Sequence, residues 1–533
     1  MIYTSERADS KLEIPDVSIT EYALRHADRL ADKPALIDGP SGRTLTFGQL
    51  ADGIKAVAGG LHARGFRKGD VLAIYCPNMP EYALVFNAVA SVGGINTTVN
   101  PLYTAAELAK QLNDANAKLL VTVPPFLDKA LEAAANSSVE EVYVFGEGEG
   151  ARSFSELTSS GASAPAVEID PKNDLVVLPY SSGTTGLPKG VMLTHHNLVA
   201  NLCQVDGFEE QKRMGEDEVI LAMLPFFHIY GMVVVMKLAL AGGATVVSMP
   251  RFDMEDFLGL IQQYKVTTLP LVPPVVLGLA KSPLVDQFDL SSVRTIFCGA
   301  APLGKELSIE AGDRIGCPVV QGYGMTEASP VTHLSSLVLE NSREGSIGKV
   351  IPETEVRVVD VESGRDCTQG EDGELWIRGP QIMKGYLNQP EETAECIDSD
   401  SWYHTGDVGY VDEDGYFFIV DRVKELIKYK AMQVSPAELE DLLVTHPAIL
   451  DTAVIPSPDE EAGEIPKAIV VLKDADLASD EMAEEIMSFV AGNVAPHKRI
   501  RILDFADQIP KSASGKILRR VLVDAERKKK TDG

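Results

Sequence analysis

The segment YSSGTTGLPKGVMLTHHN, residues 180–197, carries the side chains that hold phosphate in many enzymes. It contains three glycines, two serines, three threonines and one lysine, between an apolar run and a helical-looking segment at 198–202. Backbone N–H groups in such a loop can converge on an anion near the start of a helix. The P-loop pattern does not fit, because Lys189 precedes Gly190 and no Gly-Lys-Ser/Thr follows. The sequence therefore predicts a phosphate loop of another kind, with a plain Gly/Ser connector as the alternative.

A second cluster is rich in glycine and alanine, in the segments 297-FCGAAPLGKEL-307 and 321-QGYGMTEASPV-331. Both follow strand-like runs, and the carboxyl ends of strands are where open α/β sheets bind ligands. Small residues there allow a flat ring to lie against the backbone. Glu327 could hold a metal ion or bond to an amide of the core.

Two further clusters supply charge. In 402-WYHTGDVGY-410, together with Asp421-Arg422, a carboxylate after a tight glycine turn suits the diol of a ribose; a surface turn is the alternative. Lysines also occur in 424-KELIKYKAMQVSPAELE-440 and in 510-PKSASGKILRR-520. Each of these lysines is either a site cation or a solvated charge.

The elements that must position these clusters alternate between strand and helix. Strand-like runs that are apolar throughout occupy 71–75, 118–123, 219–223, 244–247 and 293–297. Helical candidates between them are 103–115, 255–264 and 304–315. Continuous apolar runs are typical of strands buried on both faces of a parallel sheet. The pattern predicts an α/β fold with at least one doubly wound sheet.

The pattern changes near residue 345. Strand-like runs at 355–359, 374–378 and 416–420 follow without long helices, and Asp414-Gly415 is a hairpin signal. This predicts a small antiparallel unit. After Arg422 an α+β pattern begins, with helices at 436–445 and 480–494 and strands at 453–455 and 468–472. We therefore expect a domain boundary near residue 422.

Composition limits the classes of function. The 533 residues exceed what one hydrophobic core supports, so we expect two or more domains. A net charge of −30 argues against nucleic acid or an anionic membrane as the main partner. The six cysteines are scattered without C-x-x-C spacing, which indicates reduced thiols and a cytoplasmic protein. The apolar segment 226–249 contains His228 and Lys237, and predicts a buried helix plus strand rather than a membrane span.

Taken together, and in this order along nearly the whole chain, the four clusters resemble the adenylate-forming acyl-CoA synthetase superfamily, most closely its 4-coumarate–CoA ligase and firefly luciferase branch. The resemblance implies an α/β fold with a large N-terminal adenylation domain, residues 1–421, built of two doubly wound sheet subdomains plus a small antiparallel β unit. A small mobile α+β lid domain, residues 422–533, would follow. The implied cofactors are ATP, Mg²⁺ and coenzyme A, and the implied partner is a small carboxylic acid. We expect a monomer or homodimer without integral membrane association.

The resemblance implies that a carboxylate attacks the α-phosphorus of ATP and forms an acyl-adenylate. Lys516 would be the cation that stabilises charge on the α-phosphate, and Glu327 would help hold Mg²⁺. The residues implied for ATP are Ser181, Ser182, Gly183, Thr184, Thr185, Gly186 and Lys189 at the phosphates; Gly299, Ala300, Ala301, Pro302, Gln321, Gly322 and Tyr323 at the adenine; Thr326 at the α-phosphate; and Asp407 and Arg422 at the ribose. Those implied for the acyl group are His228, Tyr230, Val234, Gly322, Pro330 and Val331.

In a second half-reaction the thiol of coenzyme A would replace AMP. The resemblance implies that the lid turns about Lys424, so that Lys516 departs and the segment from Lys428 to Gln433 enters. Residues implied for coenzyme A are Arg251, Lys430 and Ala431. The family usually has glycine where this chain has Ala431; the loop either accommodates the extra methyl group or thioester formation is slowed.

The nucleotide-binding motifs leave the acid open. An aromatic acid of the hydroxycinnamate type is the first expectation, and a medium- or long-chain fatty acid is the second. A luciferase-like oxygenase and a nucleotide-binding protein without turnover are further alternatives.

Overall fold

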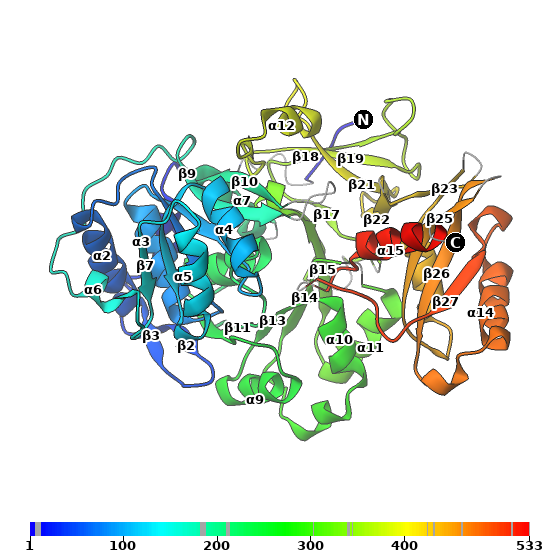
Figure 1. Cartoon of the computed structure of the whole chain (residues 1–533), viewed down its shortest axis with the longest axis horizontal. Coiled ribbons are helices and arrows are strands. Elements are labelled where there is room, and N and C mark those ends of the chain that lie inside the picture. Colours follow the sequence, from blue (N-terminus) through cyan, green and yellow to red (C-terminus); the bar gives the residue numbers. More distant parts are fainter. Residues whose placement is uncertain are drawn as a thin grey trace.

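A computed structural model of the chain describes residues 1–5, 12–181, 188–208, 214–301, 303–337, 342–343, 345–423, 425–429, 432–459, 462–512 and 515–531. The strands of this described part form four sheets. Figure 1 shows the first sheet and its helices at one side, the antiparallel sheet at the top, and the C-terminal sheet with α14 and α15 at the opposite side. The second sheet lies between them.

The first sheet has the strand order β20-β10-β9-β5-β4-β6-β7-β8. Its strands are β4 (Val71–Tyr75), β5 (Ile95–Thr98), β6 (Ala117–Thr122), β7 (Glu141–Val144), β8 (Arg152–Ser153), β9 (Leu175–Ser181), β10 (Lys189–Thr194) and β20 (Gly385–Tyr386). The strands from β9 to β8 run parallel, whereas β10 and β20 are antiparallel additions. The sheet is therefore of the α/β type predicted.

Both faces of this sheet are covered by helices. Leu72 and Ile74 of β4 join the core that includes α2 (Phe47–Ala63) and α3 (Pro80–Ser91). Val71, Ala73 and Tyr75 instead join the core formed with α4 (Ala105–Asp114) and α5 (Leu127–Ala135). Successive side chains of a strand point to opposite faces, so two buried faces require an apolar residue at every position.

The second sheet has the order β17-β16-β15-β14-β13-β11-β12-β2-β3 and is parallel from β15 to β2. Its strands are β2 (Pro34–Asp38), β3 (Thr44–Thr46), β11 (Val219–Ala222), β12 (Thr245–Ser248), β13 (Thr268–Leu271), β14 (Thr295–Cys298), β15 (Val319–Gly324), β16 (Val331–Leu334) and β17 (Lys349–Val350). The helices that share its core are α1 (Ile19–Ala23), α7 (His195–Asp206), α8 (Leu238–Gly242), α9 (Met254–Tyr264), α10 (Pro273–Lys281) and α11 (Lys305–Ile315). The apolar segment 226–249 forms a π-helix, η2 (Tyr230–Lys237), then α8 and β12. It is a buried helix plus strand, as predicted.

The third sheet is antiparallel, in the order β1-β18-β19-β21-β22. It comprises β1 (Tyr3–Thr4), β18 (Glu355–Val359), β19 (Gly373–Arg378), β21 (Tyr403–Val411) and β22 (Phe417–Arg422). The predicted hairpin joins β21 to β22, and Gly415 in its turn has φ +81°, a conformation that glycine adopts readily. The short helix α12 (Pro390–Cys396) lies between β20 and β21 in the chain.

The fourth sheet contains β23 (Ile427–Tyr429), β24 (Met432–Val434), β25 (Ile449–Asp459), β26 (Gly463–Leu472) and β27 (Ile502–Phe505). Its helices are α13 (Pro436–Val444), α14 (Asp480–Asn493) and α15 (Arg519–Thr531). These elements have their own core, which includes Ile427, Val454 and Ile486. The predicted fold class, two parallel-type sheets with an antiparallel unit and a smaller α+β part, is confirmed.

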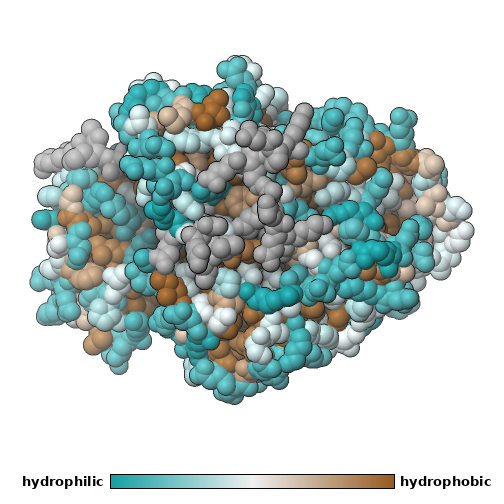
Figure 2. Space-filling view, turned by 180° about the vertical axis from the view of Figure 1, so that it is seen from behind, coloured by the Kyte–Doolittle hydropathy of each residue, from teal (hydrophilic) through white to brown (hydrophobic). Residues whose placement is uncertain are grey.

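The face of the molecule seen in Figure 2 is mostly polar. Figure 2 shows hydrophilic residues over much of one face, with hydrophobic residues in scattered groups between them. Within the described ranges, no helix combines the length and the apolar character needed to cross a membrane.

The packing of α2 on the short helix α6 (Ser155–Thr158) gives a test of the fold. A Cβ atom at Gly60 would lie 2.2 Å from the carbonyl oxygen of Leu157, which is backbone and cannot easily move. We expect Gly60→Ala to lower the free energy of unfolding by about 1–3 kcal/mol, as overpacking does. Gly259→Ala is the matched control, because the nearest atom there is 3.9 Å away and α9 should gain about 1 kcal/mol of helix propensity. Urea denaturation followed by circular dichroism measures both; equal effects would contradict the packing argument.

Candidate active site

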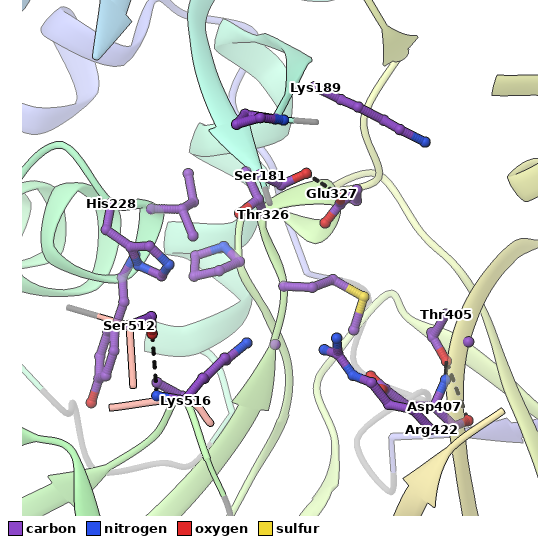
Figure 3. A pocket seen from close by; sticks show the side chains of 18 of the residues that line it. Ser181, Lys189, His228, Thr326, Glu327, Thr405, Asp407, Arg422, Ser512 and Lys516 are labelled. Carbon is purple, nitrogen blue, oxygen red and sulfur yellow. Dashed lines mark hydrogen bonds and ion pairs between the residues drawn. The ribbon is translucent and has the colours of Figure 1, made fainter. Parts of the chain in front are cut away.

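One cavity of about 1380 Å³ lies where the sheets meet. Its walls come from the carboxyl ends of β9 and β14, from β15, from β21 and β22 of the antiparallel sheet, and from the C-terminal segment that carries Lys516. Figure 3 shows Ser181, Thr326 and Glu327 at one end, Asp407 and Arg422 at the other, and Lys516 facing His228. All four sequence clusters therefore contribute to one site.

The two ends of the predicted phosphate loop lie opposite each other. Ser181 ends β9 and Lys189 begins β10, and the two residues are partners in the antiparallel ladder. Residues 182–187, which include the predicted Ser182, Gly183, Thr184, Thr185 and Gly186, lie outside the described part of the chain. The helix expected at 198–202 lies within α7, but it does not directly follow the loop. The strand β10 intervenes, because Val191 and Leu193 are buried in the sheet, and α7 begins only at His195.

Glu327 lies beside this loop on a single helical turn, Thr326–Ala328. Its Oε1 accepts hydrogen bonds from the Ser181 hydroxyl and the Tyr386 hydroxyl, both at 2.9 Å. Its Oε2 has no hydrogen-bond partner among the described residues. Mg²⁺ is commonly held by one or two carboxylates together with substrate phosphates. Within the described ranges no group of three His, Cys, Asp or Glu side chains could hold a metal ion. Glu327 is a single carboxylate in the cavity wall, which fits a Mg²⁺ ion that is shared with a phosphate ligand.

Lys189 is nearly buried at the other end of the loop. Its amine forms an ion pair with Glu392 of α12 and lies 5.0 Å from the centre of the Tyr386 ring. Tyr386 therefore contacts both Glu327 and Lys189. Sequence reasoning missed Tyr386 and Glu392, because neither belongs to a motif with a recognisable spacing.

Asp407 and Arg422 are partners in the ladder of β21 and β22. Arg422 Nε donates to Asp407 Oδ1 at 2.9 Å, and the Tyr323 hydroxyl donates to Asp407 Oδ2 at 2.5 Å. Burial first and then Asp407 hold the pKa of Tyr323 well above its usual value, so its hydroxyl stays a donor. Gly406, with φ +71°, lies within β21 rather than in the tight turn expected from the sequence. The carboxylate nevertheless faces the cavity with acceptor capacity left for a diol.

Lys516 lies at the end of a turn that begins at Ser512. A backbone hydrogen bond from Ser512 N to Lys516 O, 2.8 Å long, closes this turn. The Lys516 side chain lines the cavity and remains partly exposed there, while the protein around it removes part of its hydration. This loss of hydration is the main reason that the pKa of Lys516 lies below its usual value, and Arg422 lowers it further. Asp407 and Glu327 partly offset both effects.

The side of the cavity expected for an acyl group is mostly apolar. The predicted residues that line the cavity here are His228, Tyr230, Val234, Gly299, Ala300, Gly322, Pro330 and Val331. Leu224, Phe227, Val272, Phe297 and Met325 line it as well and were not predicted. The Tyr230 hydroxyl donates to the carbonyl of Phe297 at 3.2 Å. A Cβ atom at Gly299 would lie 3.1 Å from the Tyr230 ring, so glycine allows the ring to lie against the backbone.

Some predicted site residues do not line this cavity. Gln321 instead exchanges two hydrogen bonds of 3.2 Å with the backbone of Leu303, and Ala301 does not line the cavity either. Arg251 and Lys428 are exposed, and Lys428 pairs with Gln433 across the β23–β24 hairpin. Pro302, Lys424, Lys430 and Ala431 lie outside the described part of the chain.

Two buried histidines, His228 in the cavity wall and His333 behind Tyr323, stay neutral near physiological pH. Burial, and then the charge of Lys516, lower the pKa of His228 to about 4. His333, which lies opposite Tyr323 in the β15–β16 ladder, is fully buried, and this lowers its pKa to about 3. A histidine that stays neutral in the folded state lowers the free energy of unfolding at any pH where the same histidine is protonated in the unfolded chain.

We therefore expect stability to fall with pH below the usual histidine value of 6.5. Between pH 7 and 5 the contribution of His333 should cost about 2 kcal/mol, because its unfolded form is protonated and its folded form is not. In His333→Asn this part of the loss should be absent, although the variant is less stable overall. Urea denaturation of both proteins at pH 8, 7 and 5 measures it. An equal loss on acidification in both would show that His333 accepts a proton in the folded state.

Comparison with known proteins places this site in a family. Residues 24–387 match the family of AMP-binding enzymes, and residues 438–516 match the C-terminal domain of AMP-binding enzymes. The chain is 45% identical to 4-coumarate–CoA ligase 2 of Petroselinum crispum over 522 residues, 96% of this chain and 95% of that enzyme. It is 46% identical to the 4-coumarate–CoA ligase of Pinus taeda over 523 residues, 96% of each chain.

Solved structures are similar over the whole length. An anthranilate–CoA ligase in complex with anthranoyl-AMP has a TM-score of 0.87 at 27% identity, covering 98% of this chain and 99% of that one. ATP-bound MatB from Rhodopseudomonas palustris has a TM-score of 0.85 at 28% identity, and the apo form of the same protein 0.75; each covers 96% of this chain and 99% of that one. Since the family match spans residues 24–387, well over half of the sequence, this chain belongs to the AMP-binding enzyme family.

Proposed function

We propose that this chain is an ATP-dependent carboxylate–CoA ligase that works through an acyl-adenylate, and that its acid is aromatic, of the hydroxycinnamate type. The observation that carries the proposal is the meeting of Lys516, the Asp407–Arg422 pair and Glu327 around one cavity with an apolar side. The 4-coumarate–CoA ligases at 45% and 46% identity support the class of acid.

In the first half-reaction a carboxylate oxygen attacks the α-phosphorus of ATP, and the bond to pyrophosphate breaks. Negative charge gathers on the α-phosphate oxygens, where a positioned cation lowers the barrier most. We assign this role to Lys516, the ribose to Asp407 with Arg422, and the α-phosphate contact to Thr326. Gly299, Ala300, Gly322 and Tyr323 would border the adenine, with Ala301, Pro302 and Gln321 shaping the same wall.

The phosphates that leave would be held by the loop from Ser181 to Lys189. Its hydroxyls and backbone N–H groups are donors, and Lys189 supplies charge once the phosphate competes with Glu392. Glu327 would hold Mg²⁺, which neutralises phosphate charge when bound. The neutral imidazole of His228, with Tyr230, Val234, Pro330 and Val331, would border the acid.

In the second half-reaction the sulfur of coenzyme A attacks the acyl carbon, and AMP leaves. We infer that the part after residue 422 turns about Lys424, taking Lys516 out and bringing Lys428 and Gln433 in. Arg251, Lys430 and Ala431 would then meet coenzyme A. The arrangement described here is closer to ATP-bound MatB than to its apo form, which supports its reading as the adenylate-forming state.

We also infer a two-domain division at residue 422 and a cytoplasmic location. The strand β22 ends in the antiparallel sheet at Arg422, and β23 begins the fourth sheet at Ile427. All six cysteines are unpaired, and five of them are buried, which supports a reducing compartment.

The proposal is tested on Lys516. Lys516→Ala should cut adenylation, measured as pyrophosphate release with coumarate and ATP, by at least about 100-fold, because one positioned charge is lost from the transition state. Thioester formation from preformed adenylate should stay nearly unchanged. The control Lys529→Ala removes an exposed lysine that pairs with Asp504 and should leave both rates unaltered. Unchanged adenylation in Lys516→Ala would remove this lysine from its role.

The class of acid is tested separately. We expect pyrophosphate release to be fastest with coumarate among coumarate, benzoate, octanoate and palmitate, because the acyl side of the cavity is mostly apolar and carries the rings of Tyr230 and Phe227. Faster pyrophosphate release with palmitate than with coumarate would show that the substrate is a fatty acid and not an aromatic acid.

A further inference from the structure

The carboxylate of Asp421 makes contacts across the junction between the antiparallel sheet and the C-terminal part. Asp421 lies on β22, paired with Val408 of β21, and is 5% exposed. Its Oδ2 lies 2.7 Å from the hydroxyl of Ser435 and accepts a hydrogen bond from Ala437 N at 3.1 Å. Ser435 and Ala437 come after the segment 424–431, where the chain passes from one part to the other.

The contact is made at the start of α13, which has nine residues. Ser435 is the N-cap of this helix, and its hydroxyl oxygen accepts from Glu438 N at 3.1 Å. The same hydroxyl lies 2.9 Å from the carbonyl of Val420, so its one proton is directed at β22. A carboxylate at a helix N-terminus is stabilised by the free N–H groups and the helix dipole. Asp421 therefore completes the cap of a helix that belongs to the other part.

The helix α13 in turn holds the segment that carries Lys516. Glu440, one turn beyond Ser435, accepts a hydrogen bond from Arg519 at 2.7 Å. Both side chains of this pair are only 12% exposed. Arg519 begins α15, three residues after Lys516. A continuous set of buried polar contacts thus runs from Asp421 through α13 to the residue next to the catalytic turn.

We propose that Asp421 and Ser435 are positioning residues that form a latch: they hold α13, and through it Lys516, in the adenylate-forming arrangement. This inference rests on the two-step function proposed above. Asp421 lies before the pivot and Ser435 after it, so the hydrogen bonds between them break when the C-terminal part turns. The latch stabilises the first state and must open before the second half-reaction.

The latch is buried, so breaking its hydrogen bonds leaves buried polar groups without partners. Ser435 is 4% exposed, and both acceptors near its hydroxyl proton, Val420 O and Asp421 Oδ2, lie on β22. Losing one such hydrogen bond shifts an equilibrium by about fivefold. The free energy of this contact is therefore large enough to shift the equilibrium between the two arrangements, but too small to populate only one of them.

The test compares two serines with the same local role. Ser435→Ala removes the N-cap of α13 and the contact with Asp421. Ser479→Ala removes the N-cap of α14. The hydroxyl of Ser479 accepts a hydrogen bond from Met482 N at 3.2 Å and makes no contact with β22 among the described residues. Loss of an N-cap destabilises both helices to a similar extent, so a difference between the variants reports the latch.

Two measurements are made on each full-length protein. The first is the ratio of adenylation rate to thioester formation from preformed adenylate; we expect it to fall about fivefold in Ser435→Ala and to stay unchanged in Ser479→Ala. The second is energy transfer between dyes on cysteines introduced at the exposed positions Val361 and Leu477. We expect the distribution of distances to widen only in Ser435→Ala.

Equal ratios and equal dye distances in both variants would overturn the latch. If the parent protein releases no pyrophosphate with any acid, the proposed ligase function fails, and the dye distances alone then decide whether Asp421 and Ser435 restrain the C-terminal part. An unchanged ratio with a widened distance would show that the contact restrains the part without positioning Lys516, and would also refute the proposal.

Discussion

The site depends on keeping two cations, Lys516 and Arg422, in one cavity whose walls remove part of their hydration. Their mutual repulsion and the loss of water both lower the pKa of Lys516. The cost is offset by Asp407, which accepts from Arg422 Nε at 2.9 Å, and by Glu327 and Glu425. A chain with a net charge of −30 thus concentrates positive charge at the place where phosphate is expected.

The sheets and the C-terminal segment meet at one cavity, which places these charged residues together. The parallel sheets end at the cavity with small residues, and the antiparallel sheet supplies the Asp407–Arg422 ladder pair. Lys516 comes from the far end of the chain on a turn that no strand of those sheets supports. Its placement therefore depends on contacts of the C-terminal part, among them the Glu440–Arg519 pair and the start of α13 at Asp421.

This division suits the role proposed for Lys516, a cation that acts in the first half-reaction and leaves before the second. Asp407 and Arg422 lie on strands that are held by many ladder hydrogen bonds, so they cannot leave the site unless the sheet unfolds. The C-terminal part that carries Lys516 is joined to β22 at the start of α13 by a few buried hydrogen bonds, and a rigid rotation can exchange such contacts. Lys516 lines the cavity in the arrangement described here, whereas Lys428 does not.

The sequence alone determined the classes of element and many of the residues that line the cavity. Apolar runs such as 71–75 had to become strands buried on both faces, and the ordered motifs around Lys189, Glu327, Asp407 and Lys516 indicated a nucleotide site before any contact was known. Only the tertiary structure decided that β10 separates the loop from α7, that Tyr386 and Glu392 contact Glu327 and Lys189, and that Ser435 meets Asp421. Periodicity and spacing report local conformation and burial, whereas these contacts join residues distant in the chain, and their partners are selected by the packing of whole sheets and helices.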